Sequence, residues 1–326
     1  MRLLVTGATG KVGQAFLPAF LAEPRFSGWT VVALCNNRTL APDPRISIVK
    51  GSVADAQAVA NALEGVTHVL HLAAVKETPD QAIDVALKGL YLLLSAFSRS
   101  PKRRQFMLLS GDCVVGHIFH GYGEPITERS PRRAYRGVYA LTKVLEETMI
   151  EQFGLQEGLP WTTLRAPWIM EKDDFRYAFD LGGDQFGGPS WSSLLAPDEL
   201  AVLREQGAVP ALRDARGDYL KRSFIHIDDL VKAILAALDK PAALGELFNI
   251  AMDRPVDYGE VARLLEASGN RQRRDVPTPF HSNWLDNSKA RMVLGWQPET
   301  DLEKLVERAW SYRRAADDPR IVWYPG

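Results

Sequence analysis

The sequence predicts an α/β protein with a doubly wound parallel sheet and a smaller C-terminal α/β domain. Short apolar, β-branched runs alternate with longer helical patterns through the first half of the 326 residues. A glycine-rich turn, TGATGKVG at 6–13, directly follows the first of these runs, and beyond Pro167 the alternation loosens. Regular strand–helix alternation is typical of a parallel sheet that is covered by helices on both faces.

The elements follow one another in the order that such a sheet requires. We expect strands at 3–5, 31–34, 69–72, 106–109 and 161–164, alternating with helices at about 12–21, 56–63, 80–98 and 138–153. Strands near 224 and 247 and helices at about 257–268 and 302–314 follow. The pattern predicts a first domain of residues 1–165, completed by about 222–250, and a substrate-binding domain of residues 166–221 and 251–326.

Composition and charge argue against several classes of protein. The formal net charge is -1, and the most basic patches, at 102–104 and 271–274, are short and lie among turn residues. Nothing therefore indicates a nucleic-acid partner. The N-terminus leads straight into a strand, and no apolar run approaches the roughly 18 residues of a membrane span. The two cysteines, Cys35 and Cys113, lack the spacing of a disulfide framework or metal site, so we expect a cytoplasmic protein without metal.

The turn TGATGKVG carries the first chemical signal. Gly7, Gly10 and Gly13 stand between an expected strand and an expected helix. Glycine allows a tight turn and the close approach of backbone to a pyrophosphate, while the new helix offers free N–H groups and the positive end of its dipole. In this position the turn predicts a Rossmann domain that binds a dinucleotide.

The end of the second strand bears on which dinucleotide is bound. An acidic side chain there would hydrogen-bond the ribose hydroxyl of NAD, but the segment reads VVALCNNRT and offers Asn36 and Arg38 instead. Arg38 can pair with a 2′-phosphate through its fork of donors, which favours NADP over NAD. The alternative is that Arg38 is a solvated turn residue.

A tyrosine and a lysine lie four residues apart in the segment GVYALTKVLEE. On a helix, Tyr139 and Lys143 share one face and come within reach of each other. An ammonium group beside a phenol favours the phenolate and so lowers the pKa of the tyrosine toward a range useful for proton transfer. The pair gains weight from its place behind the glycine turn and behind LLSGDCVVGH at 108–117.

These motifs resemble those of the extended short-chain dehydrogenase/reductase family, which includes nucleotide-sugar epimerases and dehydratases. Besides TGATGKVG and the Tyr139–Lys143 pair, the resemblance includes HLAA at 71–74, RSFIHIDDL, GELFNIA and DNSKARMVLGW, in the family's order. It covers nearly the whole chain.

The resemblance implies an NAD(P)-dependent enzyme with its active site at the nicotinamide. Tyr139 would be the acid/base, and Lys143 would bind the nicotinamide ribose and tune Tyr139, while hydride moves between a substrate carbon and the nicotinamide. The implied cofactor-binding residues are Gly7, Thr9, Gly10, Lys11, Val12, Gly13, Asn36, Arg38, Ser52, Val53, Leu72, Ala73, Ala74, Tyr139, Lys143 and Pro167.

The resemblance also implies a homodimer, because family members use the helices expected here at 80–98 and 138–153 as a four-helix interface. The leucines available for it are Leu87, Leu90, Leu94, Leu141 and Leu145. The alternative is that these leucines belong only to the core.

Two positions depart from the family pattern. Counting back from VVG at 114–116, the position of the family's catalytic Ser or Thr is held by Gly111, one residue after Ser110. Either a bulge lets Ser110 supply the hydroxyl, which strict strand alternation disfavours, or the site works without it. The asparagine that the family carries in the helix at 80–98 is Ala86 here, so its water relay is absent or supplied elsewhere.

Asp112 stands where the family's dehydratases carry an acid, which makes it a candidate proton donor. The Glu that usually follows in those enzymes is Cys113 here, so oxidation, reduction or epimerisation is favoured over full dehydration. The alternative role of Asp112 is to cap the following loop. The candidate catalytic residues are therefore Tyr139, Lys143, Ser110 and Asp112.

Arginines indicate the substrate class. Arg222, in KRSFIHIDD, holds the position from which nucleotide-sugar enzymes of the family reach a diphosphate, and Arg273 or Arg274 is a candidate for a second such arginine. Each guanidinium can donate two parallel hydrogen bonds to a phosphate. We therefore expect an oxidoreductase or epimerase that acts on a nucleotide-linked sugar.

Two other functions stay open. The segment NWLDNS is similar to part of the uronate dehydrogenases, which keeps a dehydrogenase or reductase of a free sugar, or of another small carbonyl or alcohol, as an alternative. The departures at Gly111 and Ala86 keep a cofactor-binding regulator or scaffold without catalysis as the other.

Overall fold

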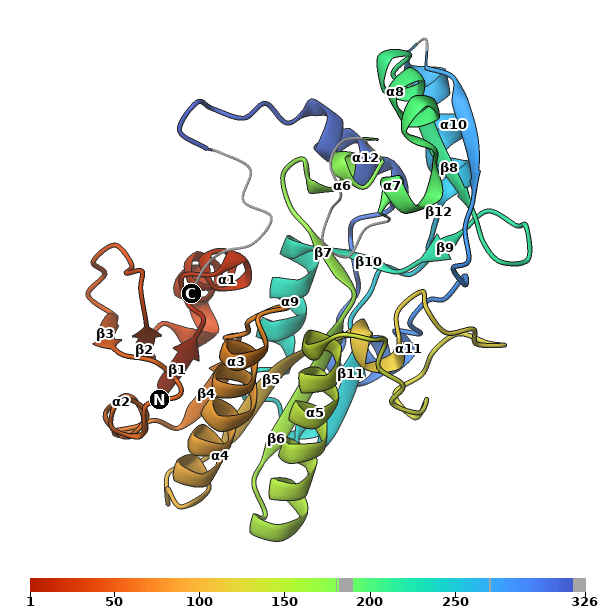
Figure 1. Ribbon diagram of the computed structural model, residues 1–326. Helices are drawn as coiled ribbons and strands as arrows, with labels where there is room; N and C mark the ends of the chain where they lie inside the picture. Colours follow the sequence, from red (N-terminus) through yellow and green to blue (C-terminus); the bar gives the residue numbers. More distant parts are fainter. Residues whose placement is uncertain (180, 182–189, 270, 319–326) are drawn as a thin grey trace.

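A parallel sheet forms the centre of the molecule, and a smaller lobe lies beyond the carboxyl ends of its strands (Figure 1). The computed structural model describes residues 1–179, 181, 190–269 and 271–318. The chain crosses between the two parts several times, so residues far apart in the sequence meet where they join.

The central sheet has seven strands in the order β11-β6-β5-β4-β1-β2-β3, and every neighbouring pair is parallel. Its strands are β1 (Arg2–Thr6), β2 (Thr30–Cys35), β3 (Ile46–Lys50), β4 (His68–His71), β5 (Gln105–Gly111), β6 (Trp161–Ala166) and β11 (Glu246–Asn249). Helices cover both faces, so the central strands are almost continuously buried. The predicted fold class is confirmed, and the strand expected near 247 joins the sheet as β11.

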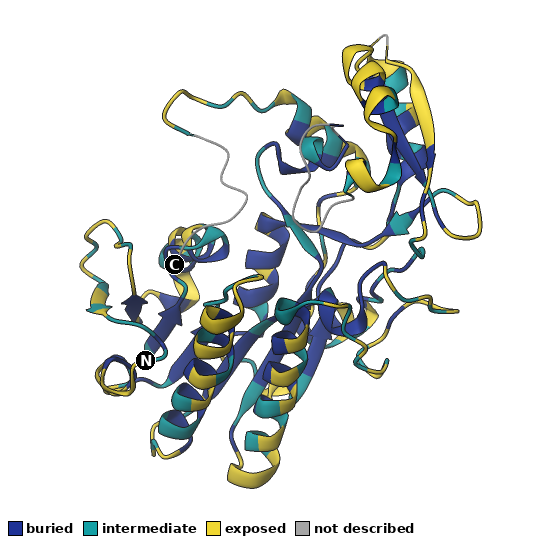
Figure 2. Cartoon of the chain, in the orientation of Figure 1, coloured by how far each residue is buried: buried dark blue, intermediate teal, exposed yellow. Residues whose placement is uncertain are grey.

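Two apolar clusters fill the space between the sheet and its helices. One lies under α1 (Lys11–Ala22), α9 (Ile227–Ala237) and α11 (Ser288–Leu294), and the other under α2 (Ala56–Ala62), α4 (Leu90–Ser98) and α5 (Val138–Glu157). Single 3-10 turns occur at η1 (Pro24–Phe26), η3 (Asp112–Val115) and η4 (Pro241–Ala243). Figure 2 shows the result: the inner strands of the sheet are buried and the edge strand β3 is largely exposed, while α4 and α5 present exposed residues on their outer sides.

The helix expected at 80–98 consists of three successive pieces. α3 (Pro79–Ala82) passes into the π-helical stretch η2 (Ile83–Gly89) and then into α4. By length and composition alone, Pro79–Ser98 is apolar enough to cross a membrane, which corrects the expectation that no segment reaches that limit. Its residues Leu90, Leu93, Leu94 and Phe97 are buried in the core, so packing against the sheet accounts for the composition.

The smaller lobe has its own apolar core and three two-stranded sheets. β7 (Trp168–Met170) pairs with β10 (Phe224–His226), β9 (Lys221–Arg222) with β12 (Val256–Asp257), and β8 (Val209–Arg213) with β13 (Arg273–Pro277). Its described helices are α6 (Asp174–Tyr177), α7 (Trp191–Leu194), α8 (Pro197–Glu205), α10 (Tyr258–Ser268) and α12 (Leu302–Ser311).

The strand expected near 224 does not complete the central sheet. Phe224 of β10 packs against Trp168 and Phe175 in the core of the smaller lobe. The next residue of β10, Ile225, and the following helix, α9, pack into the apolar cluster beside the central sheet.

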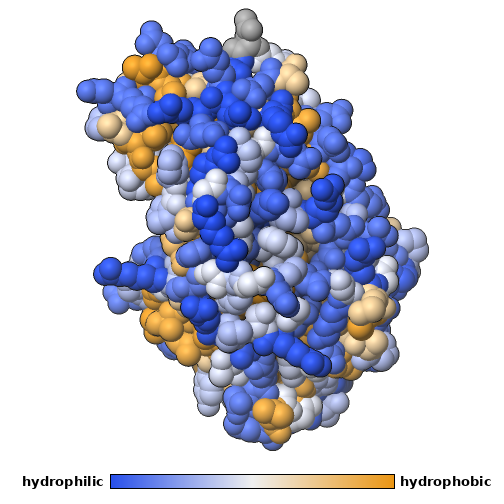
Figure 3. All heavy atoms as spheres, turned by 90° about the vertical axis from the view of Figure 1, so that its right-hand side faces the viewer, coloured by the Kyte–Doolittle hydropathy of each residue, from blue (hydrophilic) through white to orange (hydrophobic). Residues whose placement is uncertain are grey.

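The face shown in Figure 3 is mostly hydrophilic, with small, separate hydrophobic areas.

Of the leucines considered for a dimer interface, Leu90 and Leu94 are fully buried and Leu87 is partly buried. Leu141 and Leu145, both on α5, are 49% and 37% exposed. The core therefore accounts for Leu90 and Leu94, while Leu141 and Leu145 remain available at the surface.

Candidate active site

A cleft opens where the carboxyl ends of β1, β4, β5 and β6 meet the smaller lobe. Ligands of open α/β sheets bind at this edge. The sheet contributes the glycine turn, the end of β5 and the start of α5, and the smaller lobe contributes Trp168 and Arg222. The cleft is therefore the candidate active site.

The glycine turn is packed so tightly that side chains at two of its glycines would collide with backbone. Gly7 has φ +67°, and a Cβ there would lie 2.7 Å from the nitrogen of Ala73. A Cβ at Gly13 would lie 2.5 Å from the carbonyl oxygen of Ala8. Gly10 is the N-cap of α1 and provides no side-chain cap, so the first N–H groups of the helix can serve an anion in the cleft.

Most of the predicted cofactor-binding residues line this cleft. They are Gly7, Gly10, Lys11, Val12, Gly13, Leu72, Ala74, Tyr139, Lys143 and Pro167. Thr9, Asn36, Arg38, Ser52, Val53 and Ala73 are not part of its lining. Arg38 nevertheless reaches the turn, because its guanidinium donates to the carbonyl oxygen of Thr9 at 3.0 Å. The cofactor contacts of these residues stay predictions.

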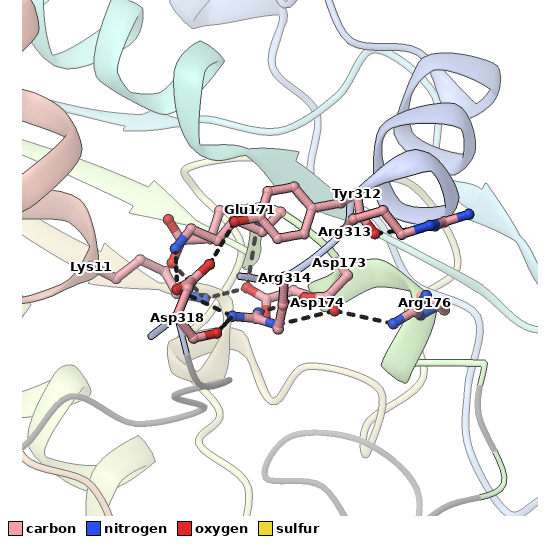
Figure 4. Close-up of polar contacts among 10 residues, drawn as sticks. Lys11, Glu171, Asp173, Asp174, Arg176, Tyr312, Arg313, Arg314 and Asp318 are labelled. Atoms are coloured by element: carbon pink, nitrogen blue, oxygen red, sulfur yellow. Dashed lines mark hydrogen bonds and ion pairs between the residues drawn. The ribbon is translucent and has the colours of Figure 1, made fainter. Parts of the chain in front are cut away.

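Lys11, at the start of α1, is bound by the smaller lobe. Its Nζ lies 2.5 Å from Asp174 Oδ2 and 3.9 Å from Glu171 Oε1. The neighbouring Asp173 pairs with Arg314 at 2.5 Å. The acidic residues Glu171, Asp173 and Asp174 thus connect the glycine turn to the C-terminal segment (Figure 4). Lys11 is predicted to bind the cofactor, and Asp174 competes for its ammonium group.

Tyr139 and Lys143 face the cleft from the N-terminal part of α5, as their spacing predicts. The Lys143 ammonium group donates to the carbonyl oxygen of Leu109 at 3.1 Å and to Oε2 of Glu146 at 2.7 Å. An ammonium group has three N–H donors. These two bonds therefore leave one donor for a ligand in the cleft.

The pKa of Tyr139 moves in the opposite direction from the prediction. Burial raises this pKa well above its ordinary value, and the nearby Cys113 and Glu146 raise it further. The carboxylate of Glu146 lies 2.7 Å from the ammonium group of Lys143, and its negative charge reduces the effect of that ammonium group on Tyr139. The residues of the chain alone thus keep Tyr139 in its phenol form, which can donate a proton.

The structure decides between the two expectations for Ser110. β5 runs to Gly111 without a bulge, with Ser110 opposite Arg165 of β6, so neighbouring side chains alternate between the faces. Ser110 Oγ donates to Glu147 Oε1 at 2.7 Å, whereas a Cβ at Gly111 would lie 3.9 Å from the Tyr139 hydroxyl. The position that faces Tyr139 therefore lacks a hydroxyl, and Ser110, which also lines the cleft, gives its hydroxyl proton to Glu147 in the structure.

Ser110 belongs instead to a buried polar network between the sheet and α5. Glu147 also accepts hydrogen bonds from Arg165 at 2.8 Å and from Arg132 at 3.0 Å. Burial opposes ionisation of Glu147, but the pairing with Arg165 outweighs it and holds the pKa of this carboxyl below its ordinary value. The network ties β5, β6 and α5 together beside the cleft, which Ser110 lines.

Asp112 begins η3 and orients two other residues of the cleft wall. Its Oδ2 lies 2.6 Å from Nδ1 of His117, and Nε2 of His117 meets the guanidinium of Arg222. Because arginine only donates, His117 accepts at Nε2 and donates from Nδ1 to Asp112. Arg222 is buried, with its guanidinium 4.8 Å from the centre of the Trp168 ring. Asp112 is thus engaged as an acceptor in the structure.

Sequence reasoning missed several groups at the site. Lys76 lies 5.2 Å from the centre of the Tyr139 ring, and burial lowers its pKa to about 8. Cys113 is buried beside Gly111, and burial raises the pKa of its thiol. No spacing signals Lys76 or His117. Glu146 did have a signal, because it follows Lys143 by three positions on a helix.

Arg273 and Arg274 do not reach the cleft. Both are exposed on β13, which pairs with β8 in the smaller lobe. Arg274 pairs with Glu199 at 2.5 Å, and Arg273 lies 3.5 Å from Asp275. The structure thus does not bring them to Arg222, and the expected arginine pair is not formed. Among the described residues, no group of three or more His, Cys, Asp or Glu side chains is placed to hold a metal ion.

Residues 3–170 match the model of the NAD dependent epimerase/dehydratase family, which is more than half of the chain and includes the glycine turn, β5 and the Tyr139–Lys143 pair. The chain belongs to this family. It is therefore an NAD(P)-dependent enzyme of the extended short-chain dehydrogenase/reductase type, and the resemblance seen in the sequence is confirmed.

Curated relatives of this family member align over most of their length. An uncharacterized UDP-glucose epimerase of Bacillus subtilis, YtcB, is 26% identical over 93% of this chain and 95% of that protein. UDP-glucuronate 4-epimerase 1 of Arabidopsis thaliana is 28% identical over 92% of this chain and 74% of that protein.

Solved structures share the fold. A short-chain dehydrogenase/reductase superfamily protein from Agrobacterium tumefaciens, with bound NAD, gives a TM-score of 0.74 at 26% identity, covering 95% of this chain and 96% of that chain. The UDP-glucuronic acid 4-epimerase of Bacillus cereus, in complex with NAD, gives 0.72 at 19% identity, covering 96% and 98%. At that identity the likeness establishes the fold alone.

Proposed function

We propose that this chain is an NAD(P)-dependent epimerase or oxidoreductase that acts on a nucleotide-linked sugar. The observation that carries the proposal is a single cleft lined by the glycine turn, the Tyr139–Lys143 pair and Arg222. Together these supply a dinucleotide site, a proton-transfer group and an anion-binding group. The alignment with UDP-sugar epimerases over most of the chain supports the substrate class.

The chain's own residues manage the proton. A bound NAD or NADP would supply hydride transfer from and back to a substrate carbon. Tyr139 exchanges the proton of the substrate hydroxyl, since its phenol group faces the cleft. Lys143 directs its remaining N–H toward a cofactor ribose hydroxyl. Ser110 serves the network around Glu147, and Asp112 orients His117, so neither has to take part in the proton step.

Arg222 binds a phosphate of the substrate in this proposal. Its guanidinium is buried beside the stacked aromatic rings of Trp168 and Phe224, at 4.8 and 5.1 Å from their centres. A buried guanidinium forms strong, directional hydrogen bonds to phosphate oxygens. His117, which contacts the same guanidinium, holds it in place at the cleft wall.

The choice of dinucleotide is a finer proposal, namely a preference for NADP. Arg38 supports it, because its hydrogen bond to Thr9 keeps the guanidinium beside the glycine turn, and β2 ends in Cys35 without an acidic residue. Separate titrations with NADH and NADPH test the preference. Tighter binding of NADH would overturn it.

We also propose a homodimer that pairs α4 and α5 of two copies. The exposed apolar residues Ile83, Tyr91, Leu141 and Leu145 on η2, α4 and α5 support it. A monomeric mass in solution would contradict it. Free, buried thiols at Cys35 and Cys113 support a cytoplasmic location, which fractionation of cells would test.

Mass spectrometry of small molecules retained by the purified protein tests cofactor and substrate class together. We expect NAD or NADP, accompanied by a nucleoside diphosphate or its sugar. A retained dinucleotide combined with turnover of free sugars only would favour the first alternative. Retention of a dinucleotide without Tyr139-dependent turnover of any sugar or nucleotide sugar would favour a regulator.

A further inference from the structure

Two adjacent glutamates of α5, both fully buried, have very different partners. Glu147 accepts hydrogen bonds from Ser110, Arg165 and Arg132. Glu146 has one cationic partner, Lys143, and its Oε1 has no hydrogen-bond partner among the described residues. A buried carboxylate is costly unless it is well paired. The partners of Glu147 explain it as part of the scaffold, whereas the one cation bound by Glu146 is the lysine of the active site.

Lys143 is fixed from two directions. The carbonyl oxygen of Leu109, at the end of β5, holds its ammonium group at 3.1 Å, and the carboxylate of Glu146 holds it at 2.7 Å. Two fixed bonds determine where the third N–H of an ammonium group points. Glu146 thus influences both the direction and the effective charge of Lys143 at the cleft.

We propose that Glu146 is a positioning residue of the active site, which fixes the Lys143 ammonium group and offsets its charge. As a result, Tyr139 remains a phenol until a cationic, oxidised nicotinamide lies beside it. The inference rests on the proposed function, because it assigns Tyr139 and Lys143 to a nicotinamide site. It goes beyond that function by naming a residue that tunes the site for the oxidised cofactor.

Other titratable groups surround Tyr139, and they come from several elements. They are Asp112 and Cys113 of η3, Tyr135 before α5, Lys76 after β4, and Lys143 and Glu146 of α5 itself. On β4, His71 lies close enough to Lys143 for the ammonium charge to lower the pKa of His71. Among them, the carboxylate in direct contact with Lys143 is that of Glu146. Its removal therefore exposes the full ammonium charge to Tyr139.

The first test uses the purified protein without cofactor. Ultraviolet absorbance of tyrosinate is followed against pH, and the signal of Tyr139 is obtained by subtracting the curve of a matched Tyr139→Phe protein. In Glu146→Gln, we expect Tyr139 to ionise at a pH about one unit lower than in the wild type, or lower still. Ionisation at the same pH in both proteins would overturn the charge-offset role.

The second test measures dissociation constants for the oxidised and the reduced dinucleotide. Removing a negative charge behind the site disfavours the cationic nicotinamide, so Glu146→Gln should raise the ratio of the oxidised to the reduced constant by about tenfold. An unchanged ratio would overturn the proposal. If the wild type bound neither dinucleotide, the proposed function would fail. The tyrosinate titration would still test whether Glu146 affects the ionisation of Tyr139.

Three variants serve as controls. Glu151→Gln makes the same change on the same helix, where Glu151 pairs with Arg132 at the surface, and should move neither readout. Glu146→Asp keeps the charge and should stay within about twofold of the wild type in the ratio. Glu146→Met should reproduce the shifts of Glu146→Gln and replaces it if the Gln variant does not fold. A loss of stability in the Gln and Met variants with both readouts unchanged would reduce Glu146 to a structural residue.

Discussion

A Cβ atom at Gly111 would lie 3.9 Å from the hydroxyl of Tyr139. Gly111 has φ -138°, which any residue adopts, and the Sγ of Cys113, 3.2 Å from that Cβ, is the atom that would have to shift. We expect Gly111→Ser to raise kcat about tenfold, because a second hydroxyl would polarise the reacting oxygen. Gly111→Ala fills the same space without a hydroxyl and is the control. Equal kcat values for the Ser and Ala variants would mean that a hydroxyl at position 111 does not assist the reaction.

Arg222 gives a prediction about substrate binding. Arg222→Met keeps an apolar chain beside Trp168 and Phe224 but removes the guanidinium, so we expect the dissociation constant for uridine diphosphate to rise about 10- to 100-fold. Calorimetry measures it. Arg274→Met removes an arginine that is exposed on β13 and should leave this constant unchanged. Unchanged binding in Arg222→Met would place the phosphate elsewhere.

The ion pair between Lys11 and Asp174, at 2.5 Å, predicts an effect on cofactor affinity. Asp174→Asn should tighten dinucleotide binding about three- to tenfold, because it releases the Lys11 ammonium group for a phosphate. The effect should shrink at high salt. Asp318→Asn, which alters the nearby contact with Lys172, is the matched control. Weaker binding in Asp174→Asn would show that the carboxylate helps to position Lys11 for the cofactor.

The lowered pKa of His71 makes the free energy of unfolding depend on pH. Burial, with a contribution from Lys143, lowers its pKa from 6.5 to about 3. The unfolded chain therefore binds a proton that the folded protein excludes, and the free energy of unfolding falls as pH falls from 6.5 toward 3, by up to about 1.4 kcal/mol per unit. His71→Gln, which does not titrate, should show a shallower fall in urea denaturation between pH 6 and pH 4. If the free energy of unfolding fell equally steeply with pH in both proteins, His71 would not be the cause of the pH dependence.

The features that the sequence predicts best are local. The alternation of strands and helices gives the central sheet, the spacing of Tyr139 and Lys143 puts both on one face of α5, and counting from VVG identifies Gly111 as the residue that faces Tyr139. Each depends on helix or strand periodicity, which neighbouring residues determine.

The features that the sequence does not predict depend on contacts between distant segments. His117 meets Arg222 across 105 positions, and Lys11 meets Asp174 across 163. β10 reads as a central strand because its residues are apolar, but Phe224 buries itself in the smaller lobe instead. Burial raises the pKa of Tyr139, and the nearby Cys113 and Glu146 raise it further, but the spacing of Tyr139 and Lys143 does not reveal how deeply the phenol is buried.

Proton transfer by Tyr139 is best tested by NMR of nucleotide sugars, including UDP-glucose and UDP-glucuronate, incubated with the protein and NAD or NADP. We expect the wild type to convert at least one of them into a stereoisomer or an oxidised product. Tyr139→Phe should lower that rate by about 10²- to 10⁴-fold while changing the dissociation constant of the dinucleotide little. An undiminished rate in Tyr139→Phe would contradict the assignment of Tyr139 as the acid/base of this enzyme.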